Sequence, residues 1–395
     1  MKLAILGTRG VPAAYGGFET LAEELSARLA ARGHDITVYS RAHGVASVVA
    51  AHRGARVVHI PTLKTKYLDT VVHAALSGLH AATQAYDAVL VCNGVNALLC
   101  RLPRLLGAST RIVLNVDGLE RNRRKWSALG KLAYALSERL SCVMPDSVVT
   151  DARSIETYYT ETYGKESSYI AYGSDLAPPA GRAALERLGL VPEGYVLYVS
   201  RFEPENNADA VLRAYRLVPG DTKLVLVGAA PYADAFVTSI RADAAGDPRV
   251  LLPGALYGEP YRELLANASV YVHATEIGGT HPALVEAMGF GRPLVVHDTP
   301  ENREAAGEAA LYVDARRTES LAAGLTALLS DPAAREKSGR AGRSRARSLY
   351  RWDAVADAYE SLLAGPGRPE DAQETLKRRP LLASVGSGIG PGSEC

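Results

Sequence analysis

The sequence predicts an α/β protein made of two Rossmann-like halves, each a parallel β-sheet covered by helices on both faces. Short apolar segments alternate with longer amphipathic segments along most of the chain. The apolar segments are continuous, as in strands that are buried on both faces. A stretch rich in Gly, Pro and Ala, residues 172–194, interrupts this rhythm, which then restarts. Two such halves joined by a linker leave a cleft between them, where ligands are expected to bind.

Length and composition limit the function. A chain of 395 residues is long enough for two cores. The net charge is +1, from 44 Lys and Arg against 43 Asp and Glu, so we expect no nucleic-acid partner. The four cysteines have no metal-ligand or CxxC spacing, which favours a reducing compartment. The apolar run near Met1 is too short for a signal peptide, and no transmembrane segment is evident. We therefore expect a cytoplasmic protein, with contact to a membrane surface left open.

The first half, residues 1–172, contains the first series of elements. Its amphipathic pattern is clearest where Leu21, Leu25 and Leu29 share one helix face and Gly33 follows. Strands are expected at Leu3–Leu6, Ile36–Tyr39, Val57–Ile60, Ala88–Cys92, Arg111–Asn115, Ser147–Thr150 and Ser168–Ala171. Helices are expected at Phe18–Arg32, Leu68–Tyr86, Asn96–Leu106, Trp126–Leu140 and Arg153–Tyr163.

After a linker at 173–194, the second half spans residues 195–349. Its strands are expected at Tyr195–Ser200, Lys223–Val227, Val250–Leu252, Val270–Val272, Leu294–Val296 and Ala310–Val313. Its helices are expected near Ala208–Arg216, Ala230–Ala244, Tyr261–Ala266, Pro282–Met288, Glu319–Leu329 and Ala334–Leu349. A last helix follows at Asp353–Leu363. Residues 365–395 are rich in Gly, Pro and Ser and are expected to be disordered.

The stretch Tyr271–Pro293 predicts an anion site. A strand is followed by a loop with Gly278, Gly279, Thr280 and His281, and then by a helix. Free N–H groups and the positive end of the helix dipole at such a point suit a phosphate. Two carboxylates, Glu276 and Glu286, flank the loop. The spacing of His273 and His281 does not suggest a metal site, and we expect no metal or other cofactor.

The loop Gly7–Glu19 follows the first strand, but it is neither GxGxxG nor a phosphate-binding P-loop. Gly16 and Gly17 would let a ligand approach the backbone at the start of a helix, although an ordinary strand–helix turn is the alternative. Past another strand, Asp117 could position or deprotonate an acceptor hydroxyl, the alternative being a turn or helix-cap Asp.

Two basic features accompany these loops. The run Arg121–Lys125, which includes Arg124, could hold an anionic acceptor or touch anionic lipid, or could simply be a solvated face. Arg201 follows the first strand of the second half and could bind a phosphate bidentately. A structural salt bridge from Arg201 to Glu203 or Glu205 is the alternative.

Taken together, the motifs GGxE, RxxPEN and EIGGTHPALVEAMGFGRPLV resemble those of the family 4 retaining glycosyltransferases, which have the GT-B fold of two facing Rossmann-like domains. The resemblance covers Met1 to Leu363. Within that family, GTRGVPAAYGGFE, NVDGLERNRRKW and RFEPENN look most like bacterial rhamnosyltransferases of capsule and exopolysaccharide synthesis.

The resemblance implies roles for the site residues. Gly16 and Gly17 match the glycine loop near the donor diphosphate, Arg201 the arginine that binds it, and Glu286 the glutamate that binds the donor ribose. The N–H groups from Thr280 to Leu284, with Gly279 and His281 in the same loop, match those near the sugar and phosphates. Asp117 falls in the acceptor-side region, and Asp117, Glu276 and Arg201 are the expected catalytic residues. Arg121, Arg124 and Lys125 are the expected acceptor contacts.

Two positions depart from the family pattern. The lysine expected five residues after Arg201 is Asn206, so another cation or the N–H donors must help hold the diphosphate. Nine residues separate Glu276 from Glu286, where the family has seven.

The resemblance implies transfer of a hexosyl group, with dTDP-rhamnose as the favoured donor, a UDP-hexose as the runner-up and a lipid-linked saccharide as acceptor. A non-catalytic sugar-nucleotide-binding subunit and an epimerase of the same fold are the two competing hypotheses. The last helix, 350–364, is expected to pack back on the first domain.

Overall fold

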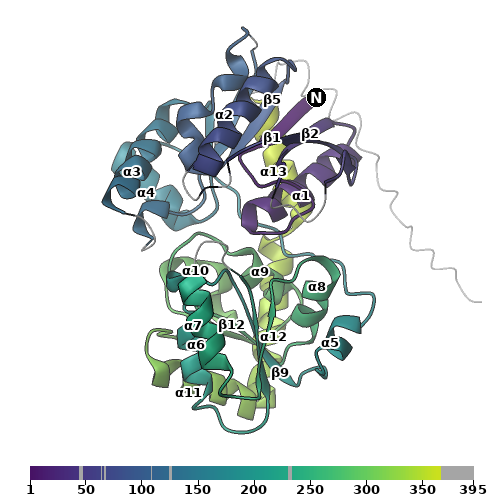
Figure 1. Ribbon diagram of the computed structural model, residues 1–395, viewed down its shortest axis with the longest axis vertical. Coiled ribbons are helices and arrows are strands. Elements are labelled where there is room, and N and C mark those ends of the chain that lie inside the picture. The colour runs from purple at the N-terminus through teal and green to yellow at the C-terminus, as the bar shows by residue number, and fades with distance from the viewer. Residues whose placement is uncertain are drawn as a thin grey trace, which may run out of the picture.

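The computed structural model describes residues 1–43, 48–63, 65, 68–107, 109–123, 127–229 and 234–365. Two α/β bodies, each built on its own sheet, lie one above the other (Figure 1). The segment 366–395, for which disorder is expected, lies outside the described residues, as do Arg124, Lys125 and Trp126. Among the described residues, no helix combines the length and apolar character needed to cross a bilayer.

The N-terminal sheet has eight strands in the order β3-β4-β2-β1-β5-β6-β7-β8. All neighbouring pairs are parallel except β3 with β4. The strands are β1 (Lys2–Leu6), β2 (Asp35–Arg41), β3 (Ala51–His52), β4 (Ala55–Ile60), β5 (Ala88–Cys92), β6 (Arg111–Asn115), β7 (Ser147–Thr150) and β8 (Ser168–Tyr169).

Helices cover both faces of this sheet. The leucines of α1 (Gly17–Ala31) share one core with the last helix, α13 (Trp352–Ala364). The opposite core contains residues of α2 (Leu68–Ala82), of the 3-10 helix η1 (Gly94–Leu99) and of α4 (Arg153–Tyr163). The remaining elements of this half are η2 (Leu102–Arg104), η3 (Glu120–Asn122) and α3 (Ala128–Val143).

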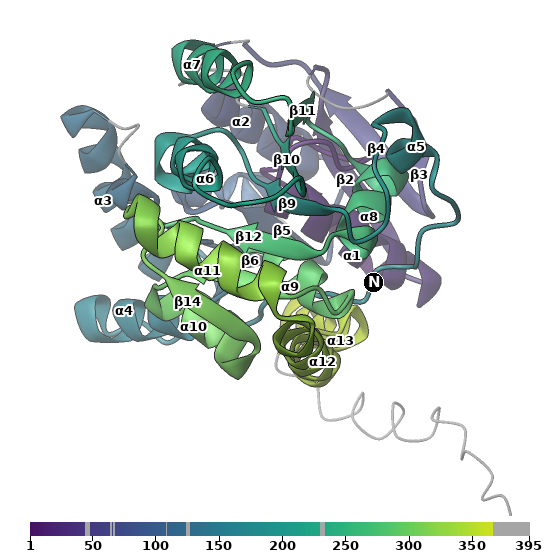
Figure 2. The same ribbon diagram turned by 90° about the horizontal axis from the view of Figure 1, so that it is seen from below.

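The C-terminal sheet has six parallel strands in the order β11-β10-β9-β12-β13-β14. Figure 2 shows it between α6, α7 and α11 on one side and α8, α9 and α12 on the other. Its strands are β9 (Tyr195–Val199), β10 (Lys223–Val227), β11 (Val250–Gly254), β12 (Val270–His273), β13 (Leu294–His297) and β14 (Ala310–Val313). Its helices are α6 (Ala208–Tyr215), α7 (Asp234–Ala244), α8 (Gly258–Asn267), α9 (Pro282–Gly289), α10 (Pro300–Ala306), α11 (Thr318–Ser330) and α12 (Pro332–Leu349), with η4 (Pro204–Asn206) and η5 (Gly307–Ala309).

The predicted fold class of two Rossmann-like halves is confirmed. The prediction of one helix over 96–106 is wrong, because the segment forms the two short 3-10 helices η1 and η2. The Asn93 side chain accepts a hydrogen bond from the Val95 N–H, and Pro103, within η2, lacks a backbone N–H donor. The sequence analysis missed β3, which is only two residues long, and α10, whose start is capped by the Thr299 hydroxyl.

The chain crosses between the bodies twice, and the two crossings are bonded together. The N–H of Ser174 donates to the carbonyl of Tyr350 over 2.7 Å, and the N–H of Trp352 donates to Asp175 over 2.6 Å. Trp352 is fully buried, and its ring fills the space where Gly173 has no side chain: a Cβ there would lie 2.3 Å from it. After this crossing, α13 packs on the N-terminal body, where Arg111 Nε donates to the carbonyl of Leu362 over 2.6 Å.

We expect Trp352→Ala to lower the free energy of unfolding by about 3–5 kcal/mol, because it empties the centre of the double crossing. Chemical denaturation monitored by circular dichroism measures this loss. Leu349→Ala, which changes a neighbouring side chain that is 54% exposed, is the matched control and should stay within about 0.5 kcal/mol of the parent. Equal losses in the two variants would contradict a central role for Trp352.

Candidate active site

A cleft of about 670 Å³ opens between the two sheets. Loops at the carboxyl ends of β1, β6, β9, β10 and β12 contribute to its lining. The chain order reverses at β1, which lies between β2 and β5, and at β9, which lies between β10 and β12. Ligands of open α/β sheets bind outside such reversal points. The cleft therefore occupies the expected ligand position of both sheets.

The structure brings most of the predicted site residues together in this cleft. They come from both bodies and from loops far apart in the sequence. The predicted residues that line it are Gly16, Gly17, Asp117, Arg201, Asn206, Gly279, Thr280, His281 and Glu286.

The other predicted residues do not line the cleft. Glu276 lines a second, smaller cavity and accepts a hydrogen bond from Asn207 Nδ2 over 3.0 Å. The side chain of Leu284 is buried in the core, and its N–H donates to His281 O over 3.1 Å. Arg121 donates to the Tyr158 hydroxyl over 2.5 Å and approaches Glu138 within 3.5 Å, so its side chain contacts α3 and α4. Arg124 and Lys125 lie outside the described residues.

Arg201 carries positive charge into the cleft. Its Nη1 donates to Glu203 over 3.3 Å, so the salt bridge considered as an alternative is present, yet the guanidinium still lines the cavity. Burial alone would lower the pKa of Arg201, but the combined interactions with Glu203, Tyr15 and Glu120 outweigh burial, and the pKa is raised. Asn206 Nδ2 donates to the backbone carbonyl of Arg201 over 2.7 Å and holds the loop that presents it. The arginine is therefore charged and held in place.

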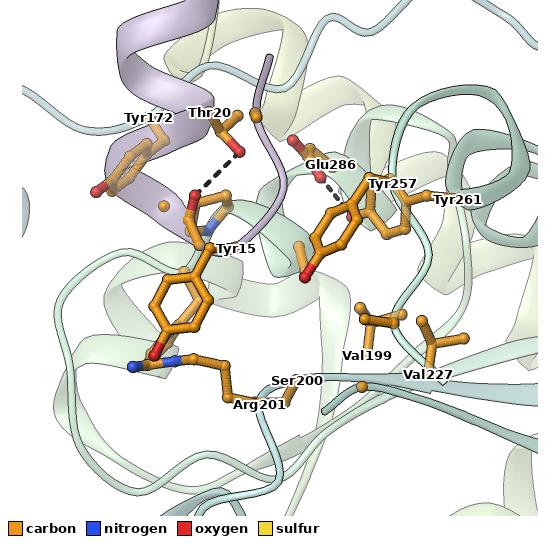
Figure 3. Close-up of a pocket in the computed structure, with 18 of the residues that line it drawn as sticks. Tyr15, Thr20, Tyr172, Val199, Ser200, Arg201, Val227, Tyr257, Tyr261 and Glu286 are labelled. Carbon is orange, nitrogen blue, oxygen red and sulfur yellow. Dashed lines mark hydrogen bonds between the residues drawn. The ribbon is translucent and has the colours of Figure 1, made fainter. Parts of the chain in front are cut away.

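Further cleft cations come from the N-terminal body, and the sequence analysis did not single them out. Arg9 lies with its guanidinium carbon 3.4 Å from the centre of the Tyr15 ring. The Arg201 guanidinium carbon lies 5.7 Å from the centre of the same ring, and Figure 3 shows the Tyr15 and Arg201 side chains facing each other. Arg123 is buried and reaches across to the other body, 3.4 Å from Glu203 and 3.6 Å from Glu205. Both Arg9 and Arg123 line the cleft.

Glu286 lies beside an apolar recess of the C-terminal body. The Tyr261 hydroxyl donates to Glu286 Oε2 over 2.5 Å, and Tyr257, Val199 and Val227 line the neighbouring wall (Figure 3). Burial raises the pKa of the Glu286 carboxyl to about 7. Near neutral pH this carboxyl can therefore accept or release a proton on ligand binding.

Two histidines complete the wall beside the glycine loop. The rings of His273 and His281 are 4.7 Å apart at their centres, and both line the cleft. Burial lowers the pKa of His273 to about 3 and that of His281 well below its ordinary value, so both are neutral. His273 Nε2 is buried without a hydrogen-bond partner. In the part of the chain that the structure describes, no three His, Cys, Asp or Glu side chains gather as metal ligands would.

Asp117 owes its position to a chain of contacts from the last helix. The Tyr359 hydroxyl of α13 accepts a hydrogen bond from Asn115 Nδ2 over 2.6 Å. Asn115 Oδ1 in turn accepts the N–H of Asp117 over 3.0 Å. Asp117 has a φ of 57°, in the left-handed region that Asp tolerates better than most residues. A backbone turn that α13 supports therefore aims the carboxyl.

The half-buried Asp117 also faces the carboxyl group of Asp151, which is fully buried. Burial raises the pKa of both groups, and repulsion from Asp117 adds to the rise at Asp151. Because each carboxylate disfavours the ionisation of the other, the pair resists losing both of its protons.

The glycine loop of the C-terminal body touches these acids directly. Thr280 Oγ1 donates to the Asp151 carbonyl over 2.5 Å. A Cβ on Gly279 would lie 1.9 Å from Asp151 Oδ1, and a Cβ on Gly118 would lie 2.8 Å from the Gly278 Cα. The bodies thus approach closely where Gly118 and Gly279 lack side chains, and Asp151 lies against the predicted phosphate loop.

Comparison with known proteins indicates the class of enzyme. Residues 193–331 match the family model described as "Glycosyl transferases group 1". Residues 84–175 match a model described as "Domain of unknown function (DUF1972)". The chain is 26% identical over 191 residues to O-antigen chain mannosyltransferase B of Escherichia coli, covering 47% of this chain and 50% of that protein. It is 27% identical over 395 residues to the GDP-mannose-dependent alpha-(1-6)-phosphatidylinositol monomannoside mannosyltransferase of Mycobacterium tuberculosis, covering 92% and 99%.

Solved structures share the fold. Sucrose-phosphate synthase from Thermosynechococcus elongatus superposes with a TM-score of 0.75 at 19% identity, covering 92% of this chain and 99% of that one. Anabaena Alr3699/HepE in complex with UDP-glucose gives 0.71 at 15% identity, covering 95% and 99%. Two facing Rossmann-like bodies with a ligand cleft between them define the GT-B fold. Residues 193–331 are thus similar to group 1 glycosyltransferases, and the chain is a glycosyltransferase of the hexosyltransferase class.

Gly118→Ala should force the two bodies apart, because the new Cβ meets backbone atoms of the facing loop at 2.8–3.2 Å. Small-angle X-ray scattering should give a larger radius of gyration than for the parent. Gly94→Ala is the matched control, since its Cβ would meet neighbours only at 3.6 Å or beyond. An unchanged radius for Gly118→Ala would contradict the close contact described here.

Proposed function

We propose that this enzyme transfers a hexosyl group, with retention, from a nucleoside-diphosphate sugar to a hydroxyl of a lipid-linked saccharide. The observation that carries the proposal is the position of Arg201, beside the helix α9 N-terminus and the buried Glu286 in one cleft. These groups suit the diphosphate and the ribose of one donor molecule. The apolar recess near Tyr257 offers the base a surface to stack on.

The diphosphate is held by arginines from both bodies. Arg201 serves one phosphate, and Arg123 supplies the second cation that is missing at Asn206. Support comes from the lining of the cleft by both guanidinium groups and from the burial of Arg123 across the domain boundary. The N–H groups at the start of α9 add neutral donors. Negative charge that develops on the leaving diphosphate is thereby met by groups already in place.

The reaction proceeds on one face of the sugar. The bond from the anomeric carbon to the diphosphate oxygen breaks, and the bond to the acceptor oxygen forms on the same side. The acceptor proton passes to the leaving phosphate oxygen. Asp117 orients the acceptor hydroxyl from the opposite wall of the cleft, and Asp151 shares a proton with it. Glu276 has no role in this proposal, because it lies outside the cleft.

The motif resemblance favours dTDP-rhamnose as the donor, with a UDP-hexose as the runner-up. The names of the relatives point to other sugars, since the mycobacterial enzyme is GDP-mannose-dependent. The lipid-linked acceptor gains support from a Campylobacter jejuni relative, 23% identical over 270 residues, which acts on a diphospho-undecaprenol saccharide.

Thermal-shift measurements with dTDP-rhamnose, UDP-glucose and GDP-mannose should show one donor that raises the melting temperature most. Transfer of radiolabel from that donor to extracted bacterial lipids tests the reaction. No transfer from any donor would overturn the proposal.

Replacing either proposed phosphate-binding arginine should selectively weaken the binding of nucleoside diphosphates. Arg201→Ala and Arg123→Gln should each reduce affinity for the diphosphate by about tenfold or more, since each removes a charge-assisted hydrogen bond. Affinity for the nucleoside alone should change little. Isothermal titration with both ligands measures the difference, and Arg121→Gln, which contacts α3 and α4, is the control. An equal loss of affinity for both ligands would show that the replaced arginine does not bind the phosphates.

Glu286 should make nucleoside binding dependent on pH. The ionised carboxyl accepts hydrogen bonds from the ribose diol, and its raised pKa of about 7 means that acid protonates it in the free enzyme. Affinity should therefore fall as the pH drops from about 8 to about 6. Glu286→Gln should bind more weakly at high pH and lose this dependence. A Gln variant with the full pH dependence of the parent would assign that titration to another group.

A further inference from the structure

Large apolar side chains are exposed on neighbouring elements of the N-terminal body. They lie on α2, on the 3-10 segments η1 and η2 with the turn that follows, and on α3; α2 contacts both 3-10 segments and α3 contacts η1. Figure 1 shows α2 and α3 on the outside of this body. We call six of these residues the apolar face: Leu76, Leu79, Leu98, Leu106, Leu132 and Leu136.

Helix α2 is turned with its leucines outward because its inner side is made of small and polar residues. His73 and Ser77 are fully buried, whereas Leu76 and Leu79 are 40% and 47% exposed. Asp69 pairs with the buried Arg41, and a Cβ on Gly78 would lie only 2.7 Å from Leu102. These contacts fix the rotation of the helix. The outward leucines therefore follow from specific packing.

Helix α3 shows the same inversion. Glu138 is buried and accepts hydrogen bonds from the hydroxyls of Tyr158 and Tyr163 over 3.0 and 3.1 Å. Ser137 and Ser141 are buried beside it. On the outer side, Leu132 and Leu136 are 66% and 56% exposed. A helix that buries its polar side and exposes leucines is built for an apolar neighbour outside the body.

The exposed charges on these elements are all positive. Among the described residues of α2, η1, η2 and α3, together with Arg101 between the two 3-10 segments, the exposed charged side chains are Arg101, Lys131 and Arg139. The acids Asp69 and Glu138 are buried in the contacts described above. A surface that combines leucine tips with cations suits the boundary between acyl chains and anionic headgroups.

We propose that the apolar face docks this enzyme onto an anionic lipid bilayer, with its leucines in the acyl boundary and Lys131 and Arg139 at the headgroups. A second copy of the chain fits less well, because a symmetric contact would bring like charges together. The loop 117–123 leads from the cleft directly towards α3, so docking would hold the acceptor side of the cleft near the membrane. The purpose of docking rests on the proposed lipid-linked acceptor, but binding itself can be tested without it.

Co-sedimentation of the full chain with vesicles tests the proposal. We expect binding to vesicles of phosphatidylcholine and phosphatidylglycerol in equal parts and much weaker binding to phosphatidylcholine alone. A variant with Leu76, Leu79, Leu132 and Leu136 all changed to Ser should bind about tenfold more weakly or worse, through lost apolar area. The matched control changes Val191, Leu217 and Leu349, exposed outside the N-terminal body, to Ser and should bind like the parent.

Lys131→Gln with Arg139→Gln should remove most of the preference for phosphatidylglycerol while leaving the melting temperature unchanged. Absence of vesicle binding, or equal binding by the apolar-face variant and its control, would overturn the proposal. Parent dimers in sedimentation velocity that the apolar-face variant disrupts, with no vesicle binding, would assign the face to a second copy. Nucleoside-diphosphate binding, measured in the same variants, should be unchanged. A parent that binds vesicles but no nucleotide sugar would reject the proposed function and leave the docking surface standing.

Discussion

The double crossing at Ser174–Tyr350 and Trp352 is the constraint on which the site depends. Both bodies contribute residues to the cleft, and the bodies are joined where two chain segments run side by side and share hydrogen bonds. The buried Trp352 ring occupies the space that Gly173 leaves free. The arrangement holds Gly118 and Asp151 against the Gly278–Thr280 loop. The double crossing therefore determines the geometry of the cleft as much as the residues that line it do.

The cleft contains two regions of different electrostatic character. Arginines from both bodies converge near Glu203, whose negative charge compensates part of theirs. A ligand with two phosphates would supply negative charge that replaces part of this compensation. On the acceptor side, burial has the opposite effect: it keeps the Asp117 and Asp151 carboxyls from ionising together. The region of the arginines therefore suits negative charge, whereas the surroundings of Asp117 and Asp151 favour protonated carboxyls. That division suits a reaction in which charge develops on a leaving phosphate and a hydroxyl gives up its proton.

Much of the fold followed from the sequence because buried parallel strands are continuous apolar runs; β5, β6, β7 and α4 have the predicted bounds. The glycine loops at strand ends line the cleft, since that position depends on topology, and the roles expected for their residues stay predictions. Arg123 was embedded in a basic run, and no local pattern distinguishes a buried arginine from a solvated one. Arg9 and Tyr15 were inside a quoted motif, but the contact of the Tyr15 ring with Arg201 depends on the other body. Glu276 was expected in the site but lies outside the cleft. Its distance in sequence from Glu286 does not reveal which side of the loop its side chain faces.

The hydrogen bond from Asn115 to Tyr359 has a consequence for how the enzyme is made. The N-terminal body emerges first from the ribosome, and domains generally fold as they appear. Its sheet can form then, but Tyr359 is translated only after the entire donor-side body. Until α13 arrives, Asn115 lacks the partner that aligns the Asp117 turn, and the core beside α1 lacks one of its helices. The N-terminal body is therefore synthesised before the C-terminal body but completed after it, and a nascent chain cannot align the Asp117 turn before the other wall of the cleft exists.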